Sequence, residues 1–395
     1  MTVSRHPYRM VRVLLAGLLP TLPCLWSCQS DGPTRGTEFA NVTADGVETS
    51  PESLIRPITG DRQRSVSLFG EFPDSETIPF EARPVHSLLQ HTDCPEGADF
   101  DPAVDPSGRW LAFASTRHAR KPDIYLKSAG GAAITQITSD PASDIQPEFS
   151  PDGKRIAFAS DRAGNFDIWV VGIDGSEATQ LTREPAHEIH PTWAPDGRRI
   201  AYCSLNPASR QWELWLLDLR QPGLRKLIGY GLYPRWSPTE DLIVYQRARQ
   251  RGQRWFSIWT LRLVGGEPQF PTEVSASATE AQILPTFSPD GQWIAFCSVS
   301  DQAGGSPSAT SDLWVVSVNG AEPVRLTEGQ GANYSPFWAK DGRTYFTSTR
   351  GGKETIWSVR PVISAVTTRP GPAEPIFEHT ALSLDSAGSA TAGGR

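Results

Sequence analysis

The stretch PEFSPDGKRIAFASDRAGNFDIWVV, residues 147–171, contains a tight turn followed by two segments with strand-like patterns. The turn is Ser-Pro-Asp-Gly (150–153), in which proline fixes φ, aspartate bonds nearby backbone and glycine accepts the left-handed conformation. After it, Ile156 and Phe158 alternate with alanines, the two-residue period of a strand packed on both faces. A second β-prone run follows at residues 167–169. The stretch therefore predicts consecutive strands joined by short connections.

The same unit is written six times along the chain. Its turn glycine recurs at positions 108, 153, 197, 291 and 342, with Glu240 in its place in the fourth copy, at spacings of 43 to 51 residues. That length suits one four-stranded blade, and a single blade cannot bury both of its faces without neighbours. We predict an all-β fold, a six-bladed β-propeller of four-stranded antiparallel blades. The copies begin with residues 102–115, 147–160, 191–204, 234–247, 285–298 and 336–348.

The ring must also close, and two segments compete for the last strand position. Residues 86–92 (HSLLQHT) align with Gln180-Leu181-Thr182, the end of the second copy. We predict that this amino-terminal segment completes the last blade, although residues 375–380 (PIFEHT) are an alternative. The repeated tryptophans of the third strands are expected to pack between blades rather than to form a ligand platform. They are Trp169, Trp215, Trp259, Trp314 and Trp357.

Composition agrees with a β-rich chain of low helix content. The 395 residues include 34 glycines and 34 prolines, and short strands with Gly/Pro turns are typical of all-β domains. The net charge of −7 becomes about −10 without residues 1–27, which hold three arginines and no acid. We therefore expect no nucleic-acid partner, because general nucleic-acid binding needs positive charge.

The amino-terminal region has the pattern of an export signal. Three arginines precede a short apolar run at residues 13–19, too short and too proline-broken for a lasting transmembrane helix. Leu25-Trp26-Ser27-Cys28 is similar to a lipobox, which predicts lipidation of Cys28. Gln29 follows the cysteine, at the position where an aspartate would retain a lipoprotein in the inner membrane. We expect an outer-membrane lipoprotein facing the periplasm or the cell surface, the alternative being a soluble periplasmic protein.

These patterns divide the chain into four parts. Residues 1–27 are the predicted signal peptide, and residues 28–83 are a flexible tether rich in Thr, Ser, Gly, Pro and acids. The propeller is expected over residues 84–362. Residues 363–395 read as a largely disordered tail.

The repeats resemble the TolB-like propeller family, whose unit contains Ser-Pro-Asp-Gly, Ile-Ala-Phe, Ser-Asp-Arg and Asp-Ile-Trp in that order. Here residues 150–153, 160–162 and 167–169 carry the turn, the Ser-Asp-Arg and the Asp-Ile-Trp elements. The resemblance covers about residues 84–360 and implies a six-bladed propeller used as a docking scaffold in the periplasm. In TolB proper the propeller contacts a peptidoglycan-associated lipoprotein and the Tol machinery. This chain departs from TolB because it has no α/β amino-terminal domain of adequate length and carries its own lipid signal.

Candidate binding residues lie just before the repeated proline, where the innermost strand meets the axial channel. In the first three copies these positions supply four carboxylates and a histidine, which could hold a calcium ion or a basic peptide end. The alternative is that each aspartate caps its own loop. The candidates are Asp99, Asp101, Asp144, Gln146, Glu188, His190, Gln282 and Asn333.

A second candidate surface is the basic loop of the fourth copy, which carries Arg247, Arg249, Arg251 and Arg254. A long Gly/Ser-rich insertion, residues 299–311, is expected on the same face. Propeller loops on one face commonly bind partners, so we expect this loop to meet an acidic protein or an anionic envelope polymer. A solvated hairpin is the alternative. A monomer is expected.

Catalytic motifs are absent from the sequence: no G-x-S-x-G, H-E-x-x-H, C-x-x-C or phosphate-binding loop occurs. We therefore predict no catalytic residues, no metal and no cofactor besides the calcium considered above. A metal-dependent lyase or hydrolase around His187 and His190 at the channel mouth is the alternative. Cys203 and Cys297 are expected to be small apolar fillers, and Cys94 to be unpaired.

Overall fold

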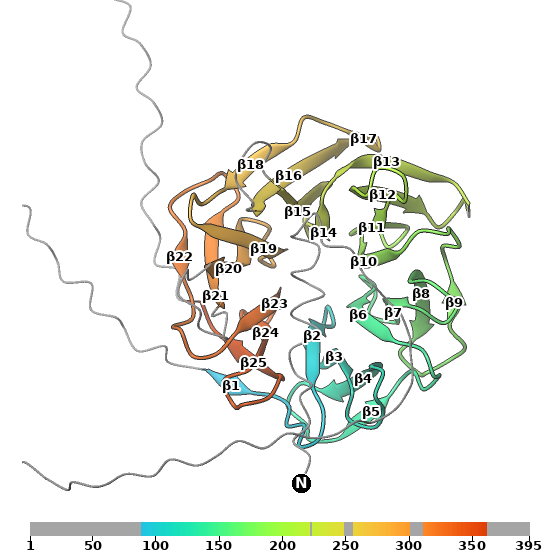
Figure 1. Cartoon of the computed structure of the whole chain (residues 1–395), viewed down its shortest axis with the longest axis vertical. Helices are drawn as coiled ribbons and strands as arrows, with labels where there is room; N and C mark the ends of the chain where they lie inside the picture. Colours follow the sequence, from blue (N-terminus) through green and yellow to red (C-terminus); the bar gives the residue numbers. More distant parts are fainter. Residues whose placement is uncertain (1–87, 222, 249–255, 301–310, 362–395) are drawn as a thin grey trace, which may run out of the picture.

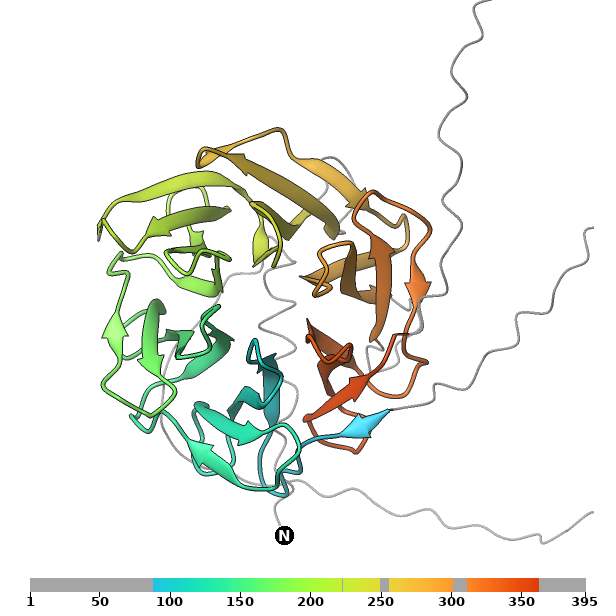
Figure 2. The ribbon, with the colours of Figure 1, turned by 180° about the vertical axis from the view of Figure 1, so that it is seen from behind.

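Six small antiparallel sheets are arranged in a ring around a central axis in the computed structural model (Figure 1; Figure 2 shows the opposite face). The structure describes residues 88–221, 223–248, 256–300 and 311–361. Within these ranges every named element is a β-strand, and none is a helix long and apolar enough to cross a membrane. The predicted all-β, six-bladed propeller is confirmed. The predicted signal peptide, the tether, the tail, Arg249, Arg251, Arg254 and most of the insertion at 299–311 lie outside the described residues.

Each blade is a meander that runs from the axis outward. Blades 1 and 2 contain β2 (Asp99–Val104), β3 (Trp110–Ser115), β4 (Asp123–Ser128) and β5 (Ile134–Gln136), then β6 (Asp144–Phe149), β7 (Arg155–Ser160), β8 (Asp167–Gly172) and β9 (Thr179–Gln180). Blade 3 contains β10 (Glu188–Trp193), β11 (Arg199–Leu205), β12 (Trp212–Asp218) and β13 (Arg225–Tyr230).

Blades 4 to 6 follow the same order, with an irregular outer edge in blade 4. Blade 4 contains β14 (Leu232–Trp236), β15 (Leu242–Ala248), β16 (Phe256–Val264), β17 (Glu267–Pro268) and β18 (Thr272–Ser275). Blade 5 contains β19 (Glu280–Phe287), β20 (Trp293–Ser300), β21 (Ser311–Ser317) and β22 (Val324–Arg325). Blade 6 contains β23 (Asn333–Trp338), β24 (Thr344–Ser348), β25 (Thr355–Val359) and, from the amino-terminal side, β1 (Leu89–Gln90).

The ring is closed by β1, as the sequence predicted. Leu89 pairs with Ser358 and Gln90 with Trp357, so the first strand of the chain lies beside its last. Beyond it, the Thr92 hydroxyl accepts a hydrogen bond from the Ile356 amide at 3.0 Å. The same bond recurs in other blades between Thr138 and Ile124, Thr182 and Ile168, and Thr327 and Leu313. The competing segment 375–380 lies outside the described residues.

The core is formed by the second strands and by the contacts between blades. Most of the largest fully buried side chains are aromatic residues of the second strands, among them Phe113, Phe158 and Tyr202. The third-strand tryptophans are only half-buried, and Trp169 packs against a cluster that includes Phe100 of the preceding blade. Burial of such rings is the main stabilising term in a fold of short strands.

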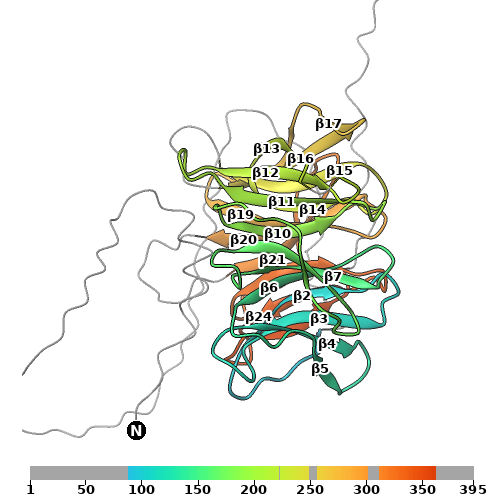
Figure 3. The same cartoon turned by 90° about the vertical axis from the view of Figure 1, so that its right-hand side faces the viewer.

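The repeated turns lie on one face of the ring, which we call the turn face. Gly153 has a φ of 69°, and its amide donates to the Ser150 carbonyl at 2.8 Å, as the turn chemistry requires. The opposite face holds the starts of the innermost strands and the connections between second and third strands, and we call it the loop face. Figure 3 shows the strands running between the two faces.

Candidate functional site

Six residues around the axis share an unusual backbone conformation. Each stands directly before the repeated proline, and the pairing of first and second strands shifts register at this point in every blade. A positive φ in residues with side chains carries a cost of order 1–3 kcal/mol and is concentrated at binding sites. The ring residues are Asp101, Gln146, His190, Tyr233, Leu284 and Ser335, with φ between 50° and 58°.

The side chains of these ring residues touch across blade boundaries. The Ser335 hydroxyl donates to Asp101 Oδ1 at 2.8 Å, which joins blades 6 and 1. The side-chain amide of Gln146 meets His190 Nε2 at 3.1 Å and accepts from the His190 amide at 2.9 Å. The His190 and Tyr233 rings are 3.6 Å apart between centroids. The ring residues therefore form a connected layer rather than six independent loops.

Burial sets the charge states in this layer. It raises the pKa of Asp101, and the Ser335 hydroxyl and Arg235 oppose that rise. Burial lowers the pKa of His190 well below its ordinary value, helped by Arg235. His190 is therefore neutral at physiological pH and can accept or donate one hydrogen bond at each ring nitrogen.

A second layer lies two residues further along the inner strands. Glu148 of β6 forms an ion pair with Arg235 of β14, two blades away. Glu148 Oε1 also accepts from the Thr192 hydroxyl at 2.8 Å, so blade 3 joins the same group. The Arg235 guanidinium lies 5.9 Å from the centre of the Phe337 ring of blade 6. Side chains from four blades thus meet at the axis.

Three adjacent blades carry the same kind of polar unit at the loop face. In blade 1 the buried Asp99 accepts from the Ser115 hydroxyl at 2.6 Å and from Arg117 Nη2 at 2.8 Å. Blade 2 repeats the ion pair with Arg162 and Asp144, also at 2.8 Å. In blade 6 an amide replaces the acid.

The blade 6 version of the unit keeps its geometry. Asn333 Oδ1 accepts from the Ser348 hydroxyl at 2.8 Å and from Arg350 Nη2 at 3.0 Å. Each of the three arginines also lies over an aromatic ring of its own blade, at 4.7–5.6 Å from the ring centre. Each guanidinium is therefore fixed on one side by a polar group and on the other by a π face. We call these three groups the clamped arginines: Arg117, Arg162 and Arg350.

Blades 3 to 5 depart from this unit. In blade 3, Arg225 pairs with Glu188 at 3.1 Å and lies over Trp215. In blade 4, Arg247 lies 5.2 Å from the centre of the Trp259 ring. Blades 6, 1 and 2 therefore form one arc of the loop face with the repeated unit, whereas blades 3 to 5 form the other arc with contacts that differ between blades.

The propeller pattern is matched by a family model described as the TolB beta propeller domain, over residues 90–265. That stretch contains blades 1 to 3 and most of blade 4, with the strand order and turns described above. The chain is a six-bladed β-propeller whose residues 90–265 are TolB-like.

Two relatives of this TolB-like propeller share part of its sequence. An uncharacterized protein of Agrobacterium fabrum is 32% identical over 105 residues, which are 26% of this chain and 32% of that protein. The Tol-Pal system protein TolB of Bordetella pertussis is 46% identical over 50 residues, 12% of this chain and 11% of that protein. The chain therefore spans a third or less of the length of these relatives.

Solved structures share the fold. A putative TolB from Agrobacterium tumefaciens superposes with a TM-score of 0.50 at 19% identity, covering 67% of this chain and 91% of that one. A gluconolactonase from Xanthomonas campestris gives 0.51 at 13% identity, covering 69% of this chain and 89% of that one. Likeness at these identities shows the architecture alone.

The residues that the sequence singled out separate into two groups in the TolB-like propeller. Asp101, Gln146 and His190 belong to the connected layer at the axis. The remaining five are buried within their blades: Asp99, Asp144, Glu188, Gln282 and Asn333. The acids of this second group contact hydroxyls and arginines. Calcium at the channel mouth stays a prediction, and no group of three or more His, Cys, Asp or Glu able to hold a metal occurs among the described residues.

The two histidines of the enzyme alternative make separate contacts. His187 is exposed, and its Nδ1 accepts from the Phe166 amide at 3.3 Å. His190 is buried between Gln146 and Tyr233. Sequence reasoning missed the arginine of the clamped unit, although Ser-x-Arg recurs at residues 115–117, 160–162 and 348–350. It also missed the axial pair of Glu148 and Arg235.

Proposed function

We propose that this chain is a non-catalytic scaffold of the cell envelope that binds a protein partner on its loop face. The proposal rests on the clamped arginines. Their side chains are held by polar and aromatic neighbours before any partner arrives, so little rotamer entropy remains to be lost on binding. Arginine is also enriched among the residues that contribute most to protein interfaces.

The geometry suggests which chemistry the partner presents. The Arg117 and Arg162 side chains are 14% and 20% exposed, so part of each remains accessible to solvent. Carboxylates and backbone carbonyls match guanidinium donors. We therefore propose a partner that places acidic or carbonyl-rich loops on blades 6, 1 and 2, with the Arg247 loop of blade 4 as a further contact for an acidic protein or an anionic envelope polymer.

Position-specific photo-crosslinking tests the proposal. Arg120 is exposed on the loop face of blade 1, and Lys154 is exposed on the turn face of blade 2. A photoreactive residue at position 120 is expected to give one adduct of defined mass in intact envelopes, and the same residue at position 154 none. Equal adducts from both positions, or none from position 120, would contradict the proposal.

We further propose that the scaffold is a monomer held at the outer membrane by a lipid on Cys28. Two or more acyl chains give durable attachment, whereas a single chain does not. Cys28→Ser is expected to move the protein from the membrane fraction to the soluble periplasmic fraction. Retention of the variant in the membrane fraction would contradict the anchor.

An enzyme with its site near His187 and His190 is the competing function. The observation that favours it is the buried His190 at the axis, whose lowered pKa keeps the imidazole neutral and able to bind a metal or accept a proton. Metal analysis of the purified protein separates the two, because a stoichiometric transition metal lost on His190→Ala would support the enzyme.

A further inference from the structure

The outer edge of blade 4 differs from every other blade. Its third strand, β16, pairs with two short strands, β17 and β18, instead of one. Trp259 pairs with Glu273, 14 residues on, whereas Tyr125, Trp169 and Trp314 pair with partners 11 residues on. The three extra residues, 269–271, project from the edge between β17 and β18.

These residues present an aromatic ring to solvent. Phe270 is 94% exposed, the highest value among the exposed large apolar side chains of the described chain. Pro268 and Pro271 flank the segment and restrict its backbone, and the Gln269 amide donates to the Arg262 carbonyl at 2.8 Å. An exposed ring on a restrained segment loses little entropy on binding, as expected of a binding platform.

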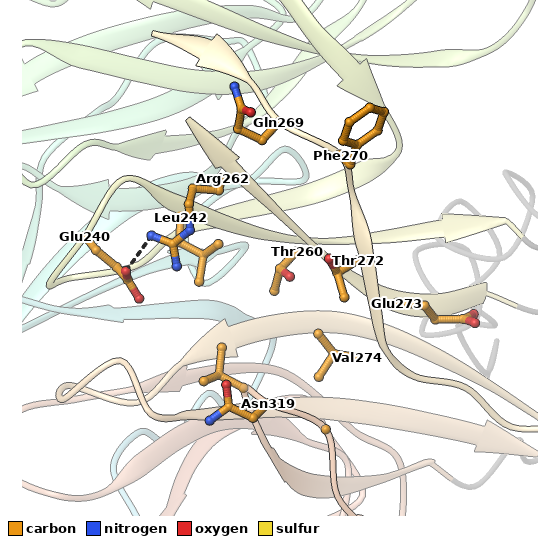
Figure 4. Close-up of a pocket in the computed structure, with 12 residues that line it drawn as sticks. Glu240, Leu242, Thr260, Arg262, Gln269, Phe270, Thr272, Glu273, Val274 and Asn319 are labelled. Atoms are coloured by element: carbon orange, nitrogen blue, oxygen red, sulfur yellow. Dashed lines mark hydrogen bonds and ion pairs between the residues drawn. The ribbon is translucent and has the colours of Figure 1, made fainter. Parts of the chain in front are cut away.

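A pocket lies beside this ring, between blade 4 and the outer turn of blade 5. Its volume is about 520 Å³, within the range of small-ligand sites. Figure 4 shows Thr260 and Thr272 on one wall, Asn319 on the facing wall, and Phe270 and Gln269 at the edge.

The polar groups of the pocket are available to a ligand. Within the part of the chain that the structure describes, no hydrogen bond is made by the side chains of Thr260, Thr272, Gln269 or Asn319. The charged pair in the wall, Arg262 and Glu240, is neutralised internally at 2.7 Å. The pocket thus offers neutral donors and acceptors beside an aromatic face.

We infer that this pocket binds a neutral saccharide unit. A pyranose ring has an apolar face of C–H groups that packs on an aromatic ring, and a rim of hydroxyls that bond with amides and hydroxyls. The two side-chain amides and two threonines suit that rim. The Arg262–Glu240 pair and Glu273 leave no excess positive charge to attract an anionic sugar.

The site is separate from the proposed docking face. Its lining comes from the outer strands of blade 4 and from the blade 5 turn at residues 318–320, at the turn-face end of the rim. A glycan bound there would leave the loop face open to a protein partner. The inference therefore does not depend on the proposed function.

Ligand titration with the purified full chain tests the site. The neutral probes are cellotetraose and chitotetraose, and the anionic comparison is tetragalacturonate. Binding of each is measured by saturation-transfer NMR. A neutral probe is expected to bind with a Kd of about 0.1–5 mM, as few hydrogen bonds and one ring contact allow. Phe270→Ala is expected to weaken it about tenfold.

Two further variants sharpen the result. Thr260→Val removes one hydroxyl while keeping the side-chain shape on β16, and is expected to weaken binding without unfolding the strand. Leu224→Ala removes another exposed apolar side chain of the rim, 60% exposed and outside the pocket, and is expected to change nothing.

Three outcomes would overturn the inference: no binding of either neutral probe, unchanged binding by Phe270→Ala, or tighter binding of tetragalacturonate than of both neutral probes. Crosslinking from position 120 in the Phe270→Ala variant is expected to match the parent, so failure of the saccharide site remains distinguishable from failure of the docking face.

Discussion

Arg235 of blade 4 forms an ion pair with Glu148 of blade 2 at the axis of the ring, although 87 residues separate them in sequence. The Glu148 side chain is 12% exposed and Arg235 is 27% exposed, so the pair is partly removed from water. Burial raises the pKa of Glu148, and Arg235 opposes that rise. The contact ties together blades that share no strand pairing.

Removal of one partner should therefore destabilise the propeller. Arg235→Met leaves Glu148 buried with only Thr192 and the Trp193 amide as partners. We expect a loss of about 2 kcal/mol in the free energy of unfolding, below the roughly 3–5 kcal/mol of fully buried pairs because Arg235 retains some contact with water. Denaturant unfolding followed by tryptophan fluorescence measures it.

The double variant Glu148→Gln with Arg235→Met should recover most of that loss, since no unpaired charge remains. Lys121→Met, at the exposed pair with Asp161, is the control and should change stability little. A single variant as stable as the parent would show that the axial pair is open to water in solution.

The clamped unit gives a second prediction because blade 6 contains a natural variant of it. Asn333 holds Arg350 where blade 2 uses Asp144 and Arg162. Asp144→Asn should therefore be nearly neutral. Arg162→Ala should cost about 3 kcal/mol, because Asp144 would stay buried without its cation.

Comparison of the two variants by thermal unfolding separates charge pairing from packing. If Asp144→Asn were as damaging as Arg162→Ala, the blade 2 unit would need its negative charge for more than holding the arginine.

The strand pattern allowed the fold to be predicted, because the turn glycines and the Ile-Ala-Phe runs repeat in register and a propeller is the closed form that buries them. The closing strand was also predictable, since Thr92 occupies the position of Thr182. The site was harder. Asp99 and Asp101 are two residues apart and would share one face of a regular strand.

The bulge explains why they do not behave alike. Asp101 takes a φ of 52° and the strand pairing shifts between Phe100 and Ala103, so Asp101 joins the axial layer while Asp99 stays within its blade. The repeated proline within the first strand is compatible with a bulge, but it does not predict the positive φ of the residue before it. The longer connection before Glu273 was visible in the sequence, but the pocket beside Phe270 also needs the blade 5 turn, whose position only the folded ring supplies.

Three buried acids should make stability fall as pH rises from about 4 to 7, opposed by the buried His190, whose lowered pKa favours the folded state at higher pH. Burial raises the pKa of Asp123 and Asp167 to about 6 and that of Glu188 to about 7, above their unfolded values near 4. The folded state therefore binds these protons more tightly than the unfolded state. Their contribution is complete below the unfolded pKa and is lost as pH rises through 6 to 7.

Glu188→Gln isolates one of these groups. Arg225 keeps Glu184 as a partner at 3.0 Å, so the substitution removes a titrating proton without stranding the arginine. The slope of Tm against pH between 5 and 8 should become shallower than in the parent, whereas the exposed Glu177→Gln should leave it unchanged. A steeper slope in Glu188→Gln would contradict the raised pKa.

The last prediction concerns closure of the ring. The same threonine–amide hydrogen bond occurs in blade 2, whose strands are consecutive in sequence, and in blade 6, which combines strands from both ends of the propeller. Thr182 accepts from the Ile168 amide at 2.9 Å, and Thr92 accepts from the Ile356 amide at 3.0 Å across 264 residues. Substitution of either threonine by valine keeps the shape and strands a buried amide, at a cost of about 1–3 kcal/mol. Both variants should lose similar stability if β1 occupies its position in solution as firmly as β9 does.

Deletion of residues 363–395 should leave the stability of both variants unchanged. A Thr92→Val variant as stable as the parent, beside a destabilised Thr182→Val, would instead show that another segment, such as residues 375–380, closes the ring.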